Sequence, residues 1–160
     1  MGIGRRFLVV ASLLLLAAAL AACGSGSSGP ELTRCPKRPP GLAGGSAGPE
    51  GETVETQPRS GLICRWRAVG GAVERHEVTI VRGLSGLVAM LNGLGPPAEG
   101  EFACESGSPV TYLIALRYRE SSEAEVEIGL EGCGFTRTEE HSYGSGGGVA
   151  RRLDTLLDGA

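Results

Sequence analysis

An apolar run of sixteen residues, Phe7 to Ala22, is the feature that most limits what this chain can fold into. Two arginines precede it, it carries no charge, and two alanines end it directly before Cys23. This is the layout of a secretory signal. At 1.5 Å per residue the run covers roughly 24 Å, against about 30 Å of hydrocarbon, which makes a permanent transmembrane helix the weaker interpretation. We therefore expect residues 1–22 to be a removed signal peptide.

The end of this run, Leu20-Ala21-Ala22-Cys23, resembles a bacterial lipobox. The resemblance implies cleavage before Cys23 and a diacylglyceryl thioether on its sulfur, and two acyl chains suffice for lasting anchorage. The expected location is the extracytoplasmic face of the cell membrane, with the chain bound through its N-terminal lipid. An ordinary secretory signal with an incidental cysteine is the alternative. The export route stays open, because Arg5-Arg6-Phe7-Leu8 resembles a twin-arginine signal while the leucine-rich core suits general secretion.

Without residues 1–22 the chain has 13 basic and 18 acidic residues, a net charge of -5, and no basic stripe. Such a balance disfavours nucleic acid as a partner. The partners that remain are the membrane and an envelope protein, a small ligand or a cell-wall component.

Four further cysteines form an even set, and exported chains retain disulfides. Three pairings are possible. We favour Cys35 with Cys64 and Cys104 with Cys133, because each pair is 29 positions apart and the second pair brackets an expected hairpin. Metal binding is the competing interpretation, but no C-x-x-C motif or histidine cluster accompanies the cysteines. We predict no metal site and no cofactor.

Residues 23–61 are rich in Gly, Ser and Pro, with few large apolar side chains, a composition that offers little apolar surface to bury. We expect a lipid-anchored flexible tether. Its cysteine would fasten the chain to the domain, leaving residues 36–60 as a largely irregular surface loop.

From residue 62 onward strand-forming residues dominate. Residues 62–69 and 73–81 fit a hairpin around Gly70-Gly71. Ser85 is the expected cap of a short helix that Gly95-Pro96-Pro97 ends.

Two segments alternate most clearly, residues 110–118 and 124–130. With Leu116 opposite Val126, one register gives an apolar face and a solvated face of paired charges, in which Arg117 lies opposite Glu125.

Residues 149–157 repeat apolar residues at helical spacing after a glycine-rich loop, which predicts a closing helix. Residues 62–160 are thus expected to form one small, disulfide-stapled α+β domain, with an antiparallel sheet of about four strands and two short helices on one face.

Residues 62–133 resemble a group of small exported actinobacterial proteins of unknown function that have two cysteine pairs. The similarity rests on four short motifs: Cys64-Arg65-Trp66, Leu91-Asn92-Gly93-Leu94 before Pro96-Pro97, Leu116-Arg117-Tyr118, and Leu130-Glu131-Gly132-Cys133. The chain departs from that pattern at Glu105, where proline is common, and at Ser121-Ser122, in place of an Asp-Gly turn. The resemblance implies no catalytic residue.

Catalytic chemistry finds little support in the sequence, which has two histidines, His76 and His141, neither in a recognised motif. The run Gly144 to Gly148 before a helix suggests phosphate binding, but it lacks the required lysine and the strand-loop-helix context, so we expect a flexible hinge. We expect a non-enzymatic binding or structural module of the cell envelope. The alternative is an envelope hydrolase that uses His141 with Glu139 or Glu140.

Overall fold

In a computed structural model of the protein, residues 32–97, 109–119, 122–132 and 134–159 are described. Within them the chain is α+β, with a mixed seven-stranded sheet and two helices. The elements in chain order are β1 (Ser46–Ala47), β2 (Ser60–Val69), β3 (Ala72–Ile80), α2 (Leu84–Asn92), β4 (Val110–Arg117), β5 (Glu123–Gly129), β6 (Phe135–Arg137), β7 (His141–Tyr143) and α3 (Gly147–Asp158).

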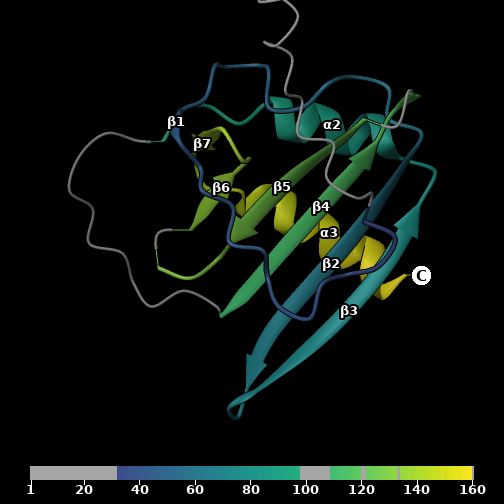
Figure 1. The fold of residues 1–160 in the computed structure, drawn as a ribbon, viewed down its shortest axis with the longest axis vertical. Coiled ribbons are helices and arrows are strands. Elements are labelled where there is room, and N and C mark those ends of the chain that lie inside the picture. Colours follow the sequence, from purple (N-terminus) through teal and green to yellow (C-terminus); the bar gives the residue numbers. More distant parts are fainter. Residues whose placement is uncertain (1–31, 98–108, 120–121, 133, 160) are drawn as a thin grey trace, which may run out of the picture.

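The strands lie in the order β1-β7-β6-β5-β4-β2-β3 (Figure 1). All neighbours are antiparallel except β1 and β7, which are parallel. The expected sheet of about four strands was therefore too small. Three-residue strands such as β6 and β7, and the two-residue β1, are too short to show an alternating pattern in the sequence.

The hairpin of β2 and β3 is confirmed, with Val69 paired to Ala72 around a turn of two glycines. Gly70 and Gly71 have φ of 56° and 83°, which explains why two glycines connect the strands. The chain then passes through α2 and returns as β4, so that β2 lies between β3 and β4. Figure 1 shows this hairpin extending beyond the rest of the sheet.

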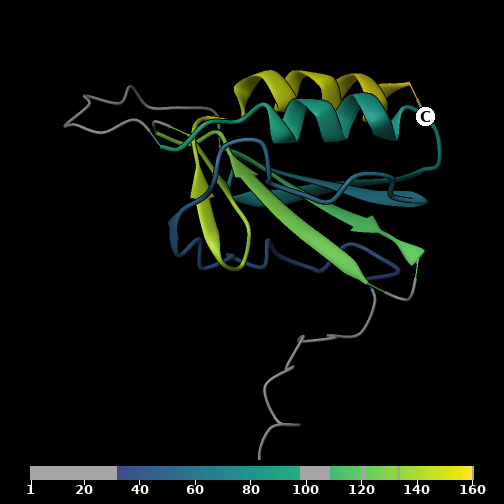
Figure 2. The same cartoon turned by 90° about the horizontal axis from the view of Figure 1, so that it is seen from above.

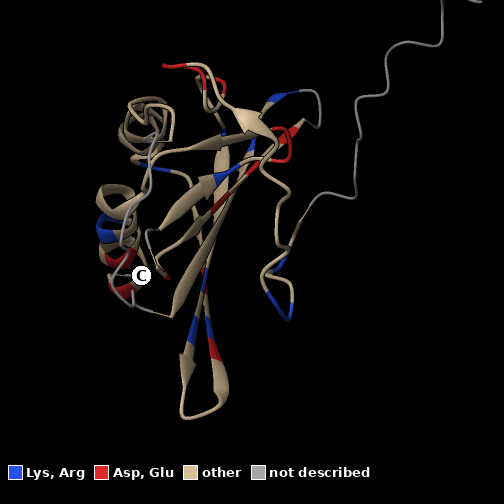
Figure 3. Ribbon diagram, turned by 90° about the vertical axis from the view of Figure 1, so that its left-hand side faces the viewer, with Lys and Arg blue, Asp and Glu red and all other residues tan. Residues whose placement is uncertain are grey.

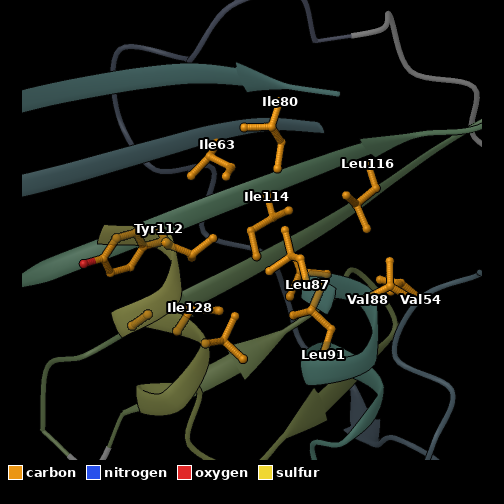
Figure 4. Packing of buried hydrophobic residues seen from close by; sticks show 14 of the residues in the cluster. Val54, Ile63, Ile80, Leu87, Val88, Leu91, Tyr112, Ile114, Leu116 and Ile128 are labelled. Atoms are coloured by element: carbon orange, nitrogen blue, oxygen red, sulfur yellow. The ribbon is translucent and has the colours of Figure 1, made fainter. Parts of the chain in front are cut away.

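Both helices cover one face of the sheet (Figure 2). Leu87, Leu91 and Leu153 are fully buried there against Ile63 and Ile114, and Figure 4 shows α2 side chains packed against those of the strands. Helix α2 begins after Gly83, whose φ of 71° turns the chain into the helix. The expectation that Ser85 caps this helix was wrong, because Ser85 lies within its first turn and no side chain caps it.

The predicted register of β4 and β5 was wrong by two residues. Leu116 pairs with Ala124, and Arg117 with Glu123, whereas Val126 pairs with Ile114. The connection is longer than expected because Tyr118 leaves the ladder, and its hydroxyl donates a hydrogen bond to the Glu55 carbonyl.

The second face of the sheet was expected to be solvated, yet it carries a smaller core of Cys35, Leu62, Cys64, Trp66, Leu113 and Ala115. This core is covered by residues 32–48, which we call the arm. In Figure 2 the arm runs along the side of the sheet opposite the helices. The described part of the predicted tether is therefore packed on the domain, and residues 36–60 are not simply an irregular loop, because β1, Thr53 and Val54 lie within them.

Candidate functional site

A disulfide between Cys35 and Cys64 fastens the arm to β2. Both cysteines are buried, Cys64 completely. Beside the bond, the Cys35 amide donates to Glu77 Oε2 at 3.2 Å, and Arg75 donates to the carbonyls of Cys35 and Pro36 at 3.3 Å. This half of the predicted pairing is confirmed, whereas Cys23, Cys104 and Cys133 lie outside the described residues.

Two glutamates of β5 hold other parts of the arm. Glu123 accepts a hydrogen bond from the Leu32 amide at 3.2 Å, and Arg117, ion-paired to Glu123 at 3.3 Å, donates to the Leu32 carbonyl. Glu127, only 4 % exposed, accepts a hydrogen bond from the Leu42 amide at 2.7 Å. Charges that the sequence suggested were a solvated surface thus bind the backbone of the arm.

Glu125 lies between these two glutamates on the same face of β5, and no hydrogen bond to its carboxylate occurs among the described residues. Burial raises its pKa, and the negative charges of Glu123 and Glu139 raise it further. The ionised form of Glu125 is therefore disfavoured in the folded chain.

A polar cluster joins β2, β4 and α3 on the face of the sheet that the helices cover. Arg65, only 7 % exposed, donates to Asp154 at 2.6 Å and to Asp158 at 3.3 Å. Burial alone lowers the pKa of Arg65, but the bond to Asp154 and the charge of Asp158 raise it above its ordinary value. The Tyr112 hydroxyl also donates to Asp154 at 2.8 Å. Burial is the main cause that raises the pKa of Tyr112, and the hydrogen bond to Asp154 raises it further. The hydroxyl therefore keeps its proton for donation.

His141 does not come together with its proposed acidic partners. It begins β7, and its Nδ1 lies 3.4 Å from Ser46 Oγ on β1, with both residues at the surface. Within the described part of the chain, no hydrogen bond or ion pair joins His141 to Glu139 or Glu140. His76 lies on the exposed edge strand β3, opposite Arg65. The geometry thus adds nothing to the hydrolase hypothesis beyond a long serine–histidine contact.

The expectation that the glycine-rich run lacks a strand-loop-helix context was wrong, because β7 precedes it and α3 begins within it at Gly147. Gly146 is closely packed, because a Cβ there would lie 2.6 Å from Thr136 Oγ1 and 2.7 Å from Ile128. Packing therefore accounts for a glycine at this position without any ligand.

The β2–β3 hairpin tip, residues 68–73, carries exposed apolar side chains. Val69 is 46 % exposed and Val73 is 58 % exposed. The tip lies at the end of β2 opposite Ser60, and Ser60 pairs with Arg117, which binds the start of the arm. Nine residue steps along β2 separate the two ends by about 30 Å. The tip therefore combines two exposed valines with a position beyond the rest of the sheet (Figure 1).

Among the described residues no helix is long and apolar enough to cross a membrane, and no three His, Cys, Asp or Glu side chains gather as metal ligands do.

Comparison of the chain with protein families, curated proteins and solved structures gives no match.

Proposed function

We propose that this chain is a membrane-anchored extracytoplasmic lipoprotein that acts as a non-enzymatic binding module of the cell envelope. The observation that carries the proposal is the Cys35–Cys64 disulfide. Such bonds persist in oxidising compartments and are rare where thiols are kept reduced. The disulfide therefore supports export, the step that the apolar run and Cys23 predict. A relationship to the small exported actinobacterial proteins belongs to the same proposal.

The position of the arm agrees with an anchor at Cys23. Leu32 is fixed to the sheet by Glu123 and Arg117, nine residue steps after Cys23. Even fully extended, those steps span at most about 31 Å. A lipid on Cys23 would thus hold the domain close to the bilayer, with the start of the arm as its nearest fixed point.

The β2–β3 hairpin is the surface that we propose binds a partner. Its tip lies about 30 Å from the fixed start of the arm along β2. A projecting apolar tip with Val69 and Val73 exposed suits an apolar groove on an envelope protein. The absence of charge between Ala68 and Val73 favours this class of partner over an ionic ligand.

The anchor is tested by intact and peptide mass spectrometry of the chain recovered from membranes. We expect an N-terminal Cys23 that carries a diacylglyceryl group, and loss of that group in a Cys23→Ala variant. A chain that is recovered with an unmodified thiol, or that begins at another residue, would remove the lipoprotein proposal.

Partner binding is tested by native mass spectrometry of the folded chain released from its own envelope. We expect a reproducible mass excess that Val69→Ser/Val73→Ser abolishes. The matched control is Val81→Ser/Met90→Ser, which also removes two exposed apolar side chains, 68 % and 37 % exposed, away from the hairpin tip. An excess lost equally in both variants would show that the hairpin is not the binding surface.

A further inference from the structure

The arm has a charge opposite to that of the rest of the protein. Arg34, Lys37 and Arg38 fall within five residues, and residues 32–48 contain no acidic residue. Between Cys23 and the arm the sequence has one acidic residue, Glu31. In a chain of net charge -5 without residues 1–22, this is a local concentration of positive charge.

These three side chains are exposed and do not take part in the contacts that hold the arm. Within the described residues, no ion pair or hydrogen bond involves the guanidinium of Arg34 or Arg38 or the ammonium of Lys37. Three acidic residues beneath the arm are occupied by other groups, whereas Glu125 has no hydrogen bond among the described residues. Glu77 and Glu127 accept backbone amides of the arm, and Glu123 is also paired with Arg117. The three cations are thus exposed, and none of the carboxylates in the described residues is ion-paired with them.

The backbone that carries the three cations is fixed. The Cys35–Cys64 disulfide and the hydrogen bonds from Arg75 hold its centre, and three prolines between residues 36 and 40 restrict it further. Figure 3 shows basic residues on the arm, on the side of the sheet away from the helices. A fixed cluster loses less conformational entropy on binding than a flexible basic segment does.

The cluster also lies where an anchored chain enters the domain. Arg34 follows Leu32 by two residues, and Leu32 is at most about 31 Å of extended chain from Cys23. The acidic turn at Glu139 and Glu140 lies at the other end of the arm, beside Gly45. With Cys23 anchored, binding of the cluster to the same bilayer becomes intramolecular, which makes weak contacts effective.

We propose that Arg34, Lys37 and Arg38 form a docking surface for anionic phospholipid headgroups, which holds the arm face of the domain against the membrane that bears the anchor. This rests on the proposed lipoprotein function. Near an anionic bilayer each Lys or Arg contributes a factor of about five in binding, equivalent to about 1 kcal/mol. Three such residues together strengthen binding to the bilayer by roughly a hundredfold. They would thus form a second attachment to the membrane, in addition to the lipid.

The test uses the chain from residue 23 to residue 160 with Cys23→Ser, so that no lipid contributes. Its partition onto phosphatidylcholine vesicles is compared with that onto vesicles in which about one third of the lipid is phosphatidylglycerol. We expect binding to the anionic vesicles alone, and its loss when salt rises from about 0.1 to 1 M, because the Debye length falls from about 10 to 3 Å.

Two variants with the same net charge locate the effect. Arg34→Gln/Lys37→Gln/Arg38→Gln should lower the partition coefficient by roughly a hundredfold. Arg82→Gln/Arg151→Gln/Arg152→Gln removes three exposed arginines from α3 and the segment before α2, and should change it by less than about twofold.

Equal losses in the two variants would overturn the docking surface, since net charge alone would then explain binding. The docking surface would also be overturned if the chain with an unsubstituted arm did not bind anionic vesicles. Neither outcome depends on lipidation of Cys23, which the mass spectrum of the membrane-derived chain decides separately.

Discussion

The Tyr112 hydroxyl and Asp154 form a 2.8 Å hydrogen bond that joins β4 to α3. The same carboxylate oxygen accepts the guanidinium of Arg65 at 2.6 Å. The closing helix is thus fixed to the sheet by a polar contact as well as by Val149 and Leu153, which are buried in the core.

This contact predicts graded effects on stability. Tyr112→Phe should cost about 1–2 kcal/mol, because it leaves one hydrogen bond to a charged group unmade. Asp154→Asn should cost about 2 kcal/mol, less than the usual 3–5 kcal/mol for a broken buried pair, since its side chain is 39 % exposed and Asp158 remains near Arg65. Chemical denaturation measures both values. Asp158→Asn is the control, and if it costs as much as Asp154→Asn, the assigned geometry is wrong.

Loss of the arm disulfide should destabilise the domain. A 29-residue separation corresponds to about 3.5 kcal/mol on the chain-entropy model. At about 3–5 °C per kcal/mol for this size, Cys35→Ala/Cys64→Ala should lower the melting temperature by more than about 10 °C in calorimetry. Hydrogen exchange of the variant should show the amides at positions 35 and 42 exposed first. An unchanged melting temperature would mean that the disulfide contributes no stability.

Glu125 should make stability depend on pH. Burial and the charges of Glu123 and Glu139 raise its pKa above the ordinary 4.5, so the folded state holds the proton more tightly than the unfolded chain. Its penalty is therefore full at neutral pH, fades as pH falls through the raised pKa, and is absent below the ordinary value. Glu125→Gln should raise the melting temperature at pH 7 and leave it unchanged near pH 4. A rise of the same size at both pH values would contradict the assignment.

Asn92 should be needed to hold the segment before β2 on α2. Its side chain accepts from the Val54 amide at 2.8 Å and donates to the Val54 carbonyl at 2.9 Å. Asn92→Ala should cost about 2 kcal/mol, as two hydrogen bonds of ordinary strength are lost. Asn92→Asp keeps the acceptor but places a negative charge near a carbonyl, and should cost at least as much. Thermal denaturation distinguishes these outcomes from a neutral surface substitution, which would change stability by less than about 0.5 kcal/mol.

Replacement of Thr136 by valine should make the protein more stable. It is fully buried on β6, and its hydroxyl has no hydrogen-bond partner among the described residues. Thr136→Val has nearly the same shape and removes the cost of a buried unpaired polar group, about 1–3 kcal/mol. We therefore expect a higher midpoint of urea denaturation. A loss of stability instead would show that the hydroxyl is bonded in solution, for example to a buried water molecule.

How far the fold follows from the sequence depends on the range of the interactions involved. The β2–β3 hairpin follows from two runs of strand-forming residues around Gly70-Gly71, and helix α3 from apolar residues at helical spacing. These are local patterns, set by backbone geometry and side-chain periodicity. The favoured Cys35–Cys64 pair also came from spacing, and the structure brings those two cysteines together.

Contacts between distant segments were decided by tertiary structure. The arm has few large apolar residues, and nothing in its own sequence shows that Glu77, Glu123 and Glu127 bind its backbone across as many as 91 positions. Strand β1 forms by pairing in parallel with β7, which lies far away in the sequence. Tyr118 lies outside the ladder of β4 on β5, and its hydroxyl donates to the carbonyl of Glu55, 63 positions away in the chain.

The α+β class, the hairpin, the closing helix and a cysteine suited to an anchor can all be predicted from the residues alone. Burial of the centre of the sheet on both faces, and the outward position of the basic residues of the arm, become visible only in the folded chain. The physical reason is that local propensity and periodicity are read within one turn or strand, whereas burial of a face depends on which distant segment covers it.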